Sequence, residues 1–109
     1  MNDNIINQEK ITEVINRIVL GFNPDKIILF GSYATGKPTE NSDLDFLIIK
    51  NSELTRPERA KELRKLLYGM KVPMDLLVYT PSEIEESINT KYSFVNEVFK
   101  TGKTVYERN

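Results

Sequence analysis

The chain has 109 residues, enough for one domain that buries roughly two thirds of its unfolded surface. We therefore expect a single domain over residues 1–109. Lys and Arg number 15 against 16 Asp and Glu, so the formal net charge of -1 provides no overall attraction to nucleic acid or to an acidic membrane. Direct binding of nucleic acid is accordingly not expected.

The sequence contains no cysteine and no histidine, which excludes disulfides, thiolate chemistry and the commonest general base. Any catalysis would have to use carboxylates, hydroxyls and lysines. The N-terminal sequence MNDNIINQEK lacks a basic region followed by an apolar run, and no stretch approaches the roughly 20 apolar residues of a membrane span. We expect a soluble, cytoplasmic protein that does not bind membranes.

The first half of the chain begins with apolar residues at helical spacing, which predict an amphipathic helix that stops close to Gly21. A turn at residues 23–25 and the apolar run KIILF then predict a buried strand that ends before Gly31. Pro38 and its polar neighbours indicate a loop, and DLDFLIIK indicates a second strand. The expected elements are a helix at residues 7–20, strands at 26–30 and 43–50, and a loop at 37–42.

The second half predicts a helix, a third strand and a helical region. Pro57 suits a first helical turn, Gly69 suits the end of that helix, and Pro73 suits the beginning of a strand. A last helix is expected to end near Gly102, followed by an extended tail. The expected elements are a helix at residues 55–68, a strand at 72–80, and helices within 81–88 and 93–102.

Three aspartates near strand ends are the candidate functional residues. Because side chains alternate along a strand, Asp43 and Asp45 should project to one face and their apolar neighbours Leu44 and Phe46 to the other. Asp75 is the lone acid of an apolar strand, where burial without a partner would be unfavourable. If the two strands are neighbours, the three carboxylates meet, and a hard divalent cation such as Mg²⁺ is their natural partner.

The Gly31-Ser32 pair after the first strand suits a phosphate. Gly31 allows the backbone to approach a ligand, and Ser32 offers a hydroxyl and an amide at a possible helix start. Simpler interpretations stay open at this point. Gly31-Ser32 could be a plain turn, Ser42-Asp43 could turn the chain before a strand, and Asp75 could be an exposed edge residue.

The run GSYATGKPTENSDLD at residues 31–45 resembles the signature of the DNA polymerase β-type nucleotidyltransferases, and specifically of the minimal nucleotidyltransferase (MNT) family. The family pattern is Gly-Ser, ten residues, then Asp-x-Asp, and the run matches it without a gap. Asp75 falls where the family carries its third carboxylate, and the ending FVNEVFKTGKTVYE is also similar. One residue departs, since Thr35 stands where many relatives have an arginine.

The resemblance implies an α+β fold, with helices packed on a small mixed β-sheet, and two-metal nucleotidyl transfer. Asp43 and Asp45 would ligate both Mg²⁺ ions, and Asp75 would ligate the ion that activates the acceptor hydroxyl. Gly31 and Ser32 would hold the phosphates of ATP.

The resemblance also implies a partner, because MNT proteins typically act as antitoxins of HEPN-domain ribonuclease toxins and transfer AMP to a toxin tyrosine. Two alternatives are an MNT protein that neutralises its partner by binding alone, and a small-molecule nucleotidyltransferase. The first two differ in the mass of the partner, which a transferred AMP increases. We expect a hetero-oligomer with the toxin.

Two further patterns admit a structural explanation. A locally basic stretch at residues 56–71 is typical of a solvated helix face, with a surface for an RNA-bound or acidic partner as the alternative. Aromatic residues of the second half are expected in the core or on a partner-facing surface: Tyr68, Tyr79, Tyr92, Phe94 and Phe99.

Overall fold

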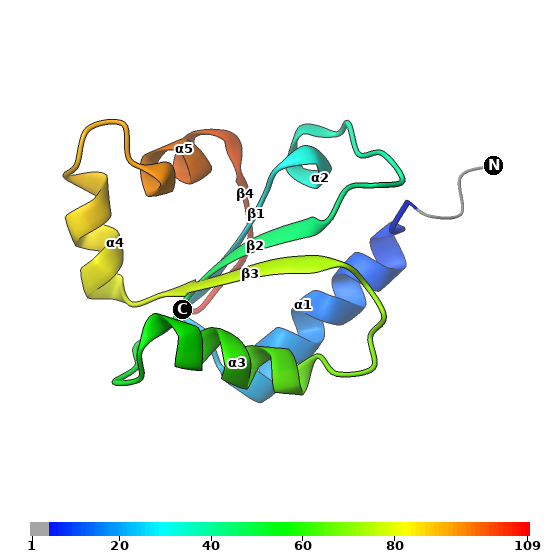
Figure 1. Ribbon diagram of the computed structural model, residues 1–109, viewed down its shortest axis with the longest axis horizontal. Coiled ribbons are helices and arrows are strands. Elements are labelled where there is room, and N and C mark those ends of the chain that lie inside the picture. The colour runs from blue at the N-terminus through cyan, green and yellow to red at the C-terminus, as the bar shows by residue number, and fades with distance from the viewer. Residues whose placement is uncertain (1–4) are drawn as a thin grey trace.

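The computed structural model describes residues 5–109 as helices packed on one sheet (Figure 1). The elements in chain order are α1 (Gln8–Phe22), β1 (Lys26–Phe30), α2 (Ser32–Thr35), β2 (Leu44–Ile49), α3 (Arg56–Leu66), β3 (Met74–Tyr79), α4 (Pro81–Ile88), α5 (Phe94–Thr101) and β4 (Lys103–Glu107). Within this part of the chain no helix combines the length and apolarity needed to cross a membrane.

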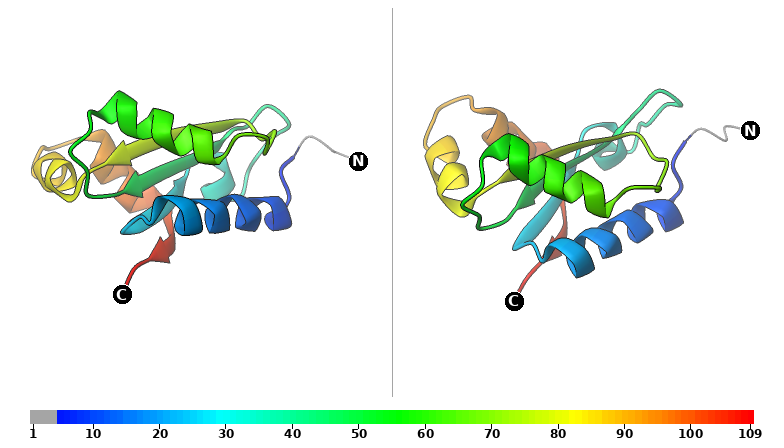
Figure 2. Two further views of the ribbon diagram at one scale, coloured as in Figure 1. Left: turned by 90° about the horizontal axis from the view of Figure 1, so that it is seen from below. Right: turned by 60° about the horizontal axis from the view of Figure 1, so that its bottom comes forward.

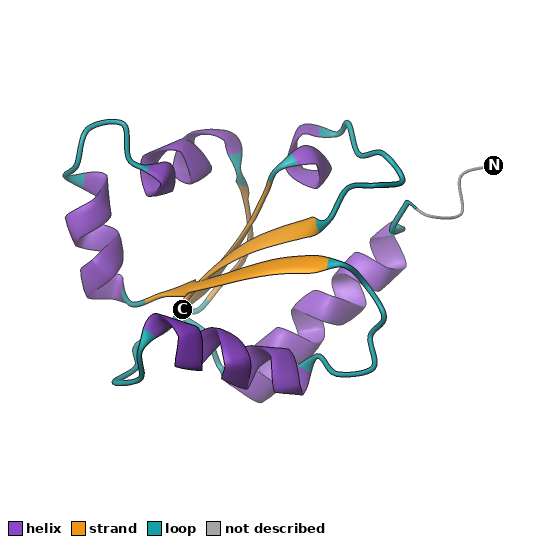
Figure 3. Ribbon diagram, viewed as in Figure 1, coloured by secondary structure: helices purple, strands orange, loops and turns teal. Residues whose placement is uncertain are grey.

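The sheet is mixed, with strand order β3-β2-β1-β4 (Figure 3). β1 pairs antiparallel with both β2 and β4, whereas β2 and β3 are parallel and are joined through α3. One end of the sheet therefore combines the starts of β2 and β3 with the end of β1. The α+β fold with a small mixed sheet, expected from the resemblance, is confirmed.

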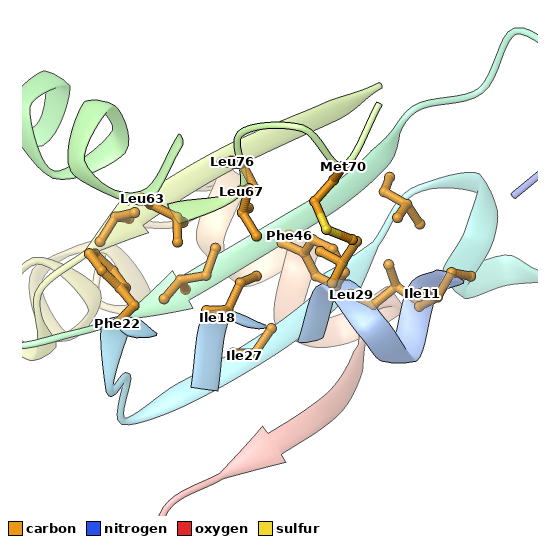
Figure 4. Close-up of a cluster of buried hydrophobic side chains, with 14 of the residues drawn as sticks. Ile11, Ile18, Phe22, Ile27, Leu29, Phe46, Leu63, Leu67, Met70 and Leu76 are labelled. Carbon is orange, nitrogen blue, oxygen red and sulfur yellow. The ribbon is translucent and has the colours of Figure 1, made fainter. Parts of the chain in front are cut away.

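Helices α1 and α3 cover one face of the sheet side by side, as the two views of Figure 2 show. Their apolar sides pack on the inward-facing residues of β1, β2 and β3 in the larger core (Figure 4). Leu44 and Phe46 of β2 are fully buried in this core. Gly21 lies where α1 meets α3, because a Cβ there would come within 3.1 Å of Leu66.

Helices α4 and α5 cover the other face of the sheet only in part. A smaller core joins Ile84 of α4 and Val95 and Val98 of α5 to Ile28, Leu47 and Ile49 of the strands. Asp43 and Asp75, at the beginnings of β2 and β3, are exposed. The start of the two parallel strands is therefore accessible on this face.

Local sequence signals account for most element ends. Thr55 and Thr80 each form a capping box with the glutamate three residues on, which begins α3 and α4. The expected stop of α1 close to Gly21 is confirmed to within one residue: the helix ends at Phe22, and Asn23 adopts the left-handed conformation, with φ 52°, just before Pro24.

Two elements are better defined in the structure than in the sequence expectation, and one strand starts a residue later. The expected extended tail is strand β4, which pairs with β1 at the edge of the sheet. A four-residue helix, α2, begins at Ser32, where the sequence suggests a possible helix start. Asp43 lies one residue before β2, rather than inside the strand.

Candidate active site

The strand register brings the candidate acids to one end of the sheet. Asp45 and Asp75 are direct partners across the parallel β2–β3 pair. Phe30, the last residue of β1, is the antiparallel partner of Asp45, so the Gly31-Ser32 turn follows at the same end. Asp43 precedes Asp45 by two residues. The condition stated from the sequence, that the two acidic strands are neighbours, is met.

Alternation along β2 places the acids on the open face. Leu44 and Phe46 point into the core under α1 and α3, which directs Asp45 to the opposite face of the sheet. Its exposure is intermediate, whereas Asp43 and Asp75 are exposed. The predicted separation of acidic and apolar side chains along this strand is therefore confirmed.

Only glycine fits at position 31 without strain, because of the backbone conformation there and because the Asp45 side chain lies close by. Its φ of 76° and ψ of -158° lie in a region that L side chains rarely adopt. A Cβ at this position would lie 2.1 Å from Oδ2 of Asp45. The Asp45 carboxylate is thus in contact with the turn that begins α2, and this contact joins the acidic strand to the Gly-Ser pair.

The turn itself is held by backbone hydrogen bonds. The Gly31 carbonyl accepts from the amides of Ala34 and Thr35, at 3.0 and 3.1 Å. The Thr35 hydroxyl donates to the Ser32 carbonyl at 3.2 Å. The first turn of α2 is therefore closed by an uncharged side chain.

Asp45 has an unusual pKa for a carboxyl group. Desolvation by burial, and then the negative charges of Asp75 and Asp43, raise the pKa of Asp45 from 3.8 to about 6. Burial and like charges both act against the ionised form. Among residues 5–109 no lysine or arginine forms an ion pair with Asp45, which is the electrostatic situation that a bound cation would relieve.

The acids nevertheless do not form a ready-made metal cage. Within residues 5–109, no three His, Cys, Asp or Glu side chains are grouped closely enough to hold a metal ion. Asp75 is exposed on the edge strand β3, so of the two interpretations left open by the sequence the exposed edge residue holds, and no partner is needed to offset its burial. The donor set still fits a hard divalent cation, since carboxylate oxygens line one sheet end and Asp45 is desolvated against Gly31.

Arg59, placed by the sequence in the basic stretch, is a buried structural residue. Its guanidinium contacts Glu83 at 2.6 Å and the carbonyls of Val78 and Leu54 at 3.0 and 2.9 Å. Glu83 also accepts from the Thr80 amide, which caps α4. Sequence spacing alone could not reveal this pairing, because Arg59 and Glu83 belong to different helices.

Comparison with known proteins gives the family. The family described as nucleotidyltransferase domain matches residues 9–102. A protein of Methanocaldococcus jannaschii, provisionally named as a protein adenylyltransferase, is 34% identical over 105 residues, which cover 93% of this chain and 100% of its own. A second protein of that organism with the same provisional name is 37% identical over 81 residues, 74% of this chain and 78% of its own. The chain therefore belongs to the nucleotidyltransferase domain family.

Solved structures share the fold. A nucleotidyltransferase-like protein of Sulfolobus solfataricus superposes with a TM-score of 0.64 at 19% identity, covering 92% of this chain and 79% of its own. A complex of a tri-AMPylated HEPN toxin of Shewanella oneidensis with its MNT antitoxin gives a TM-score of 0.58 at 19% identity, covering 93% and 72%. A toxin-antitoxin structure with AMP-PNP gives 0.58 at 24% identity, covering 95% and 76%.

Proposed function

We propose that this protein is an antitoxin that transfers AMP from ATP to a tyrosine hydroxyl of a HEPN-domain ribonuclease. The observation that carries the proposal is the contact between the Asp45 carboxylate and the Gly31 turn, with Asp75 directly across from Asp45. This arrangement puts oxygen ligands for a cation beside a backbone that can approach phosphate.

The acids and the turn have separate tasks in this proposal. Asp43 and Asp45 would hold two Mg²⁺ ions, and Asp75 would share the ion nearer the acceptor. The ions supply neutralisation of phosphate charge and a lowered pKa of the acceptor hydroxyl. Gly31 and Ser32 would bind the β and γ phosphates of ATP through backbone amides and the serine hydroxyl.

The transfer step needs positioning more than covalent help from the protein. The acceptor oxygen forms a bond to the α-phosphorus of ATP, the bond from that phosphorus to the bridging oxygen breaks, and pyrophosphate leaves. The hydroxyl proton passes to water. Asp75 is exposed and can therefore be reached by a hydroxyl presented from outside.

A protein acceptor is supported by the relatives. The two similar proteins of M. jannaschii carry the provisional name of protein adenylyltransferases, and one of them is matched over its whole length. The S. oneidensis complex contains an AMPylated HEPN toxin bound to an MNT antitoxin. These names favour a protein substrate over a small molecule.

Intact-mass spectrometry of a cognate HEPN partner tests the proposal. After incubation with the wild-type chain, Mg²⁺ and ATP, the partner should gain the mass of one or more AMP groups, and an Asp45→Asn chain should leave it unshifted. A partner that is neutralised without a mass shift would establish inhibition by binding instead. Pyrophosphate release with a small hydroxyl compound, and none with the partner, would establish a small-molecule enzyme.

A further inference from the structure

An aromatic pair lies next to the acidic end of the sheet. The rings of Phe30 and Phe94 meet edge to face, with centroids 5.5 Å apart and planes at 81°. Phe30 is also the cross-strand partner of Asp45, and directly opposed residues on antiparallel strands have side chains on the same face. One residue therefore connects the Phe94 ring to the carboxylate that contacts the Gly31 turn.

Phe94 is half exposed, although it begins a helix that packs on the sheet. It is the first residue of α5, after the capping residue Ser93, and 47% of its surface is accessible. The neighbouring Val95 and Val98 are buried and hold α5 in place. The helix is thus fixed by other side chains, which leaves the Phe94 ring with an accessible surface.

A second phenylalanine of the same helix provides an internal comparison. Phe99 is 38% exposed, and its ring lies 5.7 Å from Nζ of Lys26, at the opposite end of β1 from Phe30. The two rings belong to one helix and have similar exposure, but only Phe94 adjoins the acidic end. The two phenylalanines therefore differ mainly in where they lie along β1.

We propose that the exposed ring of Phe94 is the platform on which the purine base of a bound nucleoside triphosphate stacks, an inference that rests on the nucleotide-binding part of the proposed function. With phosphates at Gly31-Ser32 and cations at Asp45, the base is carried on the same face of the sheet, where Phe30 supports the Phe94 ring. A base and an aromatic ring attract through dispersion and exclusion of water, without directional hydrogen bonds. The platform should therefore accept adenine and guanine alike.

Calorimetric titration with three probes tests this role in the full chain with Mg²⁺. Phe94→Leu keeps an apolar side chain but removes the ring, and should weaken binding of ATP by about 5- to 150-fold, the range expected for loss of one base–aromatic stack. Binding of tripolyphosphate, which has no base, should be unchanged. The same substitution should reduce the affinity for CTP by less than the affinity for ATP, because a pyrimidine offers a smaller stacking surface.

Two further variants separate stacking from a structural effect. Phe99→Leu removes a comparable ring from the same helix, and should leave all three affinities as in the wild type. Phe94→Trp should retain ATP affinity, and because the chain has no tryptophan its single indole should report base stacking as fluorescence quenching by ATP but not by tripolyphosphate.

The outcomes distinguish this inference from the proposed function. Equal ATP affinity of wild type and Phe94→Leu would overturn the stacking role and leave AMP transfer intact. An equal loss for ATP and tripolyphosphate would also overturn it, since the change would then act on the phosphate site. Phe94-dependent ATP binding without any transfer to a HEPN partner would retain the stacking role and reject the proposed acceptor. A wild-type chain that binds no nucleotide would reject both.

Discussion

The charged groups at the two ends of β3 differ: among the described residues, acids lie close together without a basic partner at its start, whereas an acid and a base are paired at its other end. At its start, Asp75 lies across from Asp45, and desolvation together with neighbouring acids raises the pKa of Asp45 to about 6. Beyond the other end of β3, Glu83 accepts a hydrogen bond from the buried Arg59. This hydrogen bond is the main reason that the pKa of Glu83 is lowered to about 2. Arg59 also donates to the carbonyl of Val78 within β3 itself.

This difference indicates that the charged pair at one end stabilises the fold, whereas the acids at the other end are suited to binding a ligand. Arg59 and Glu83 satisfy each other and nearby backbone groups, so their charges stabilise the folded chain without help. The acids at the start of β2 and β3 repel one another and destabilise it. An arrangement that lowers stability when the chain is alone is expected where a bound cation and phosphate complete the site.

The largest effect should come from removing the central acid. We expect Asp45→Asn to reduce AMP transfer by at least about 100-fold. The variant loses a carboxylate that would hold the cations, and these cations would neutralise the negative charge of the transferring phosphate. Initial rates of pyrophosphate release with a HEPN partner give the measurement. Glu83→Gln is the matched control at the other end of β3, and transfer by its folded fraction should equal the wild type. Equal losses in the two variants would contradict the division between the ends.

Removing Arg59 from its pair with Glu83 should lower the stability of the fold. Arg59→Met leaves Glu83 without its main partner and removes donors from two backbone carbonyls, so the free energy of unfolding should fall by about 2–3 kcal/mol. Urea unfolding at pH 7 measures it. Adding Glu83→Gln to this variant should restore part of the loss, because the uncompensated carboxylate is then absent. A double variant as unstable as the sum of the single changes would contradict a coupled pair.

Gly31→Ala should affect both stability and the site. Alanine is strained at a φ of 76° and its methyl group overlaps the Asp45 carboxylate, so we expect a loss of about 1–2 kcal/mol and weakened MgATP binding. Gly36→Ala is a close control, because Gly36 has a φ of 81° but no atom within 4 Å of the added Cβ. It should lose similar stability while binding MgATP normally. If both variants bind alike, the contact with Asp45 has no role in the site.

The smallest effect concerns pH in the metal-free protein. A folded pKa above the unfolded value means that protonated Asp45 stabilises the fold, and that this stability is lost as pH rises from about 4 through about 6. A shift of this size corresponds to about 3 kcal/mol, which solvent screening of the half-exposed group reduces to about 1 kcal/mol. In EDTA, Asp45→Asn should therefore unfold like the wild type near pH 4 and be more stable by about 1 kcal/mol at pH 8. Unfolding curves at both pH values provide the check, and a constant difference would contradict it.

The sequence could predict the features that depend on neighbours along the chain. Alternation fixed the faces of Asp45 and Phe46, and the capping signals Thr55 and Thr80 mark where helices begin. Gly21 marks the end of α1 to within one residue, because the helix continues only to Phe22. Local patterns fail where a tertiary contact decides the conformation.

The features that the sequence could not predict depend on pairing across the fold. The tail after Gly102 contains the strand-forming residues Thr104, Val105 and Tyr106, but its place in the sheet as β4 depends on pairing with the open edge of β1. Arg59 looks like one cation of a basic helix until Glu83 is brought beside it. The exposure of Asp75 likewise depends on β3 being the edge of the sheet, which the order of elements does not determine.

The most direct test of the acidic end is a comparison of melting temperatures at pH 8 for wild type and Asp45→Asn, each in EDTA and in Mg²⁺ with ATP. A ligand that binds only the folded state raises the melting temperature, by an amount that grows with the logarithm of its affinity. We predict a reversal of order: Asp45→Asn melts higher in EDTA, where desolvation and then like charges destabilise the ionised Asp45 of the wild type, and the wild type melts higher in Mg²⁺ and ATP. The same order in both conditions, or an equal gain by both proteins, would contradict a cation and nucleotide site at Asp45.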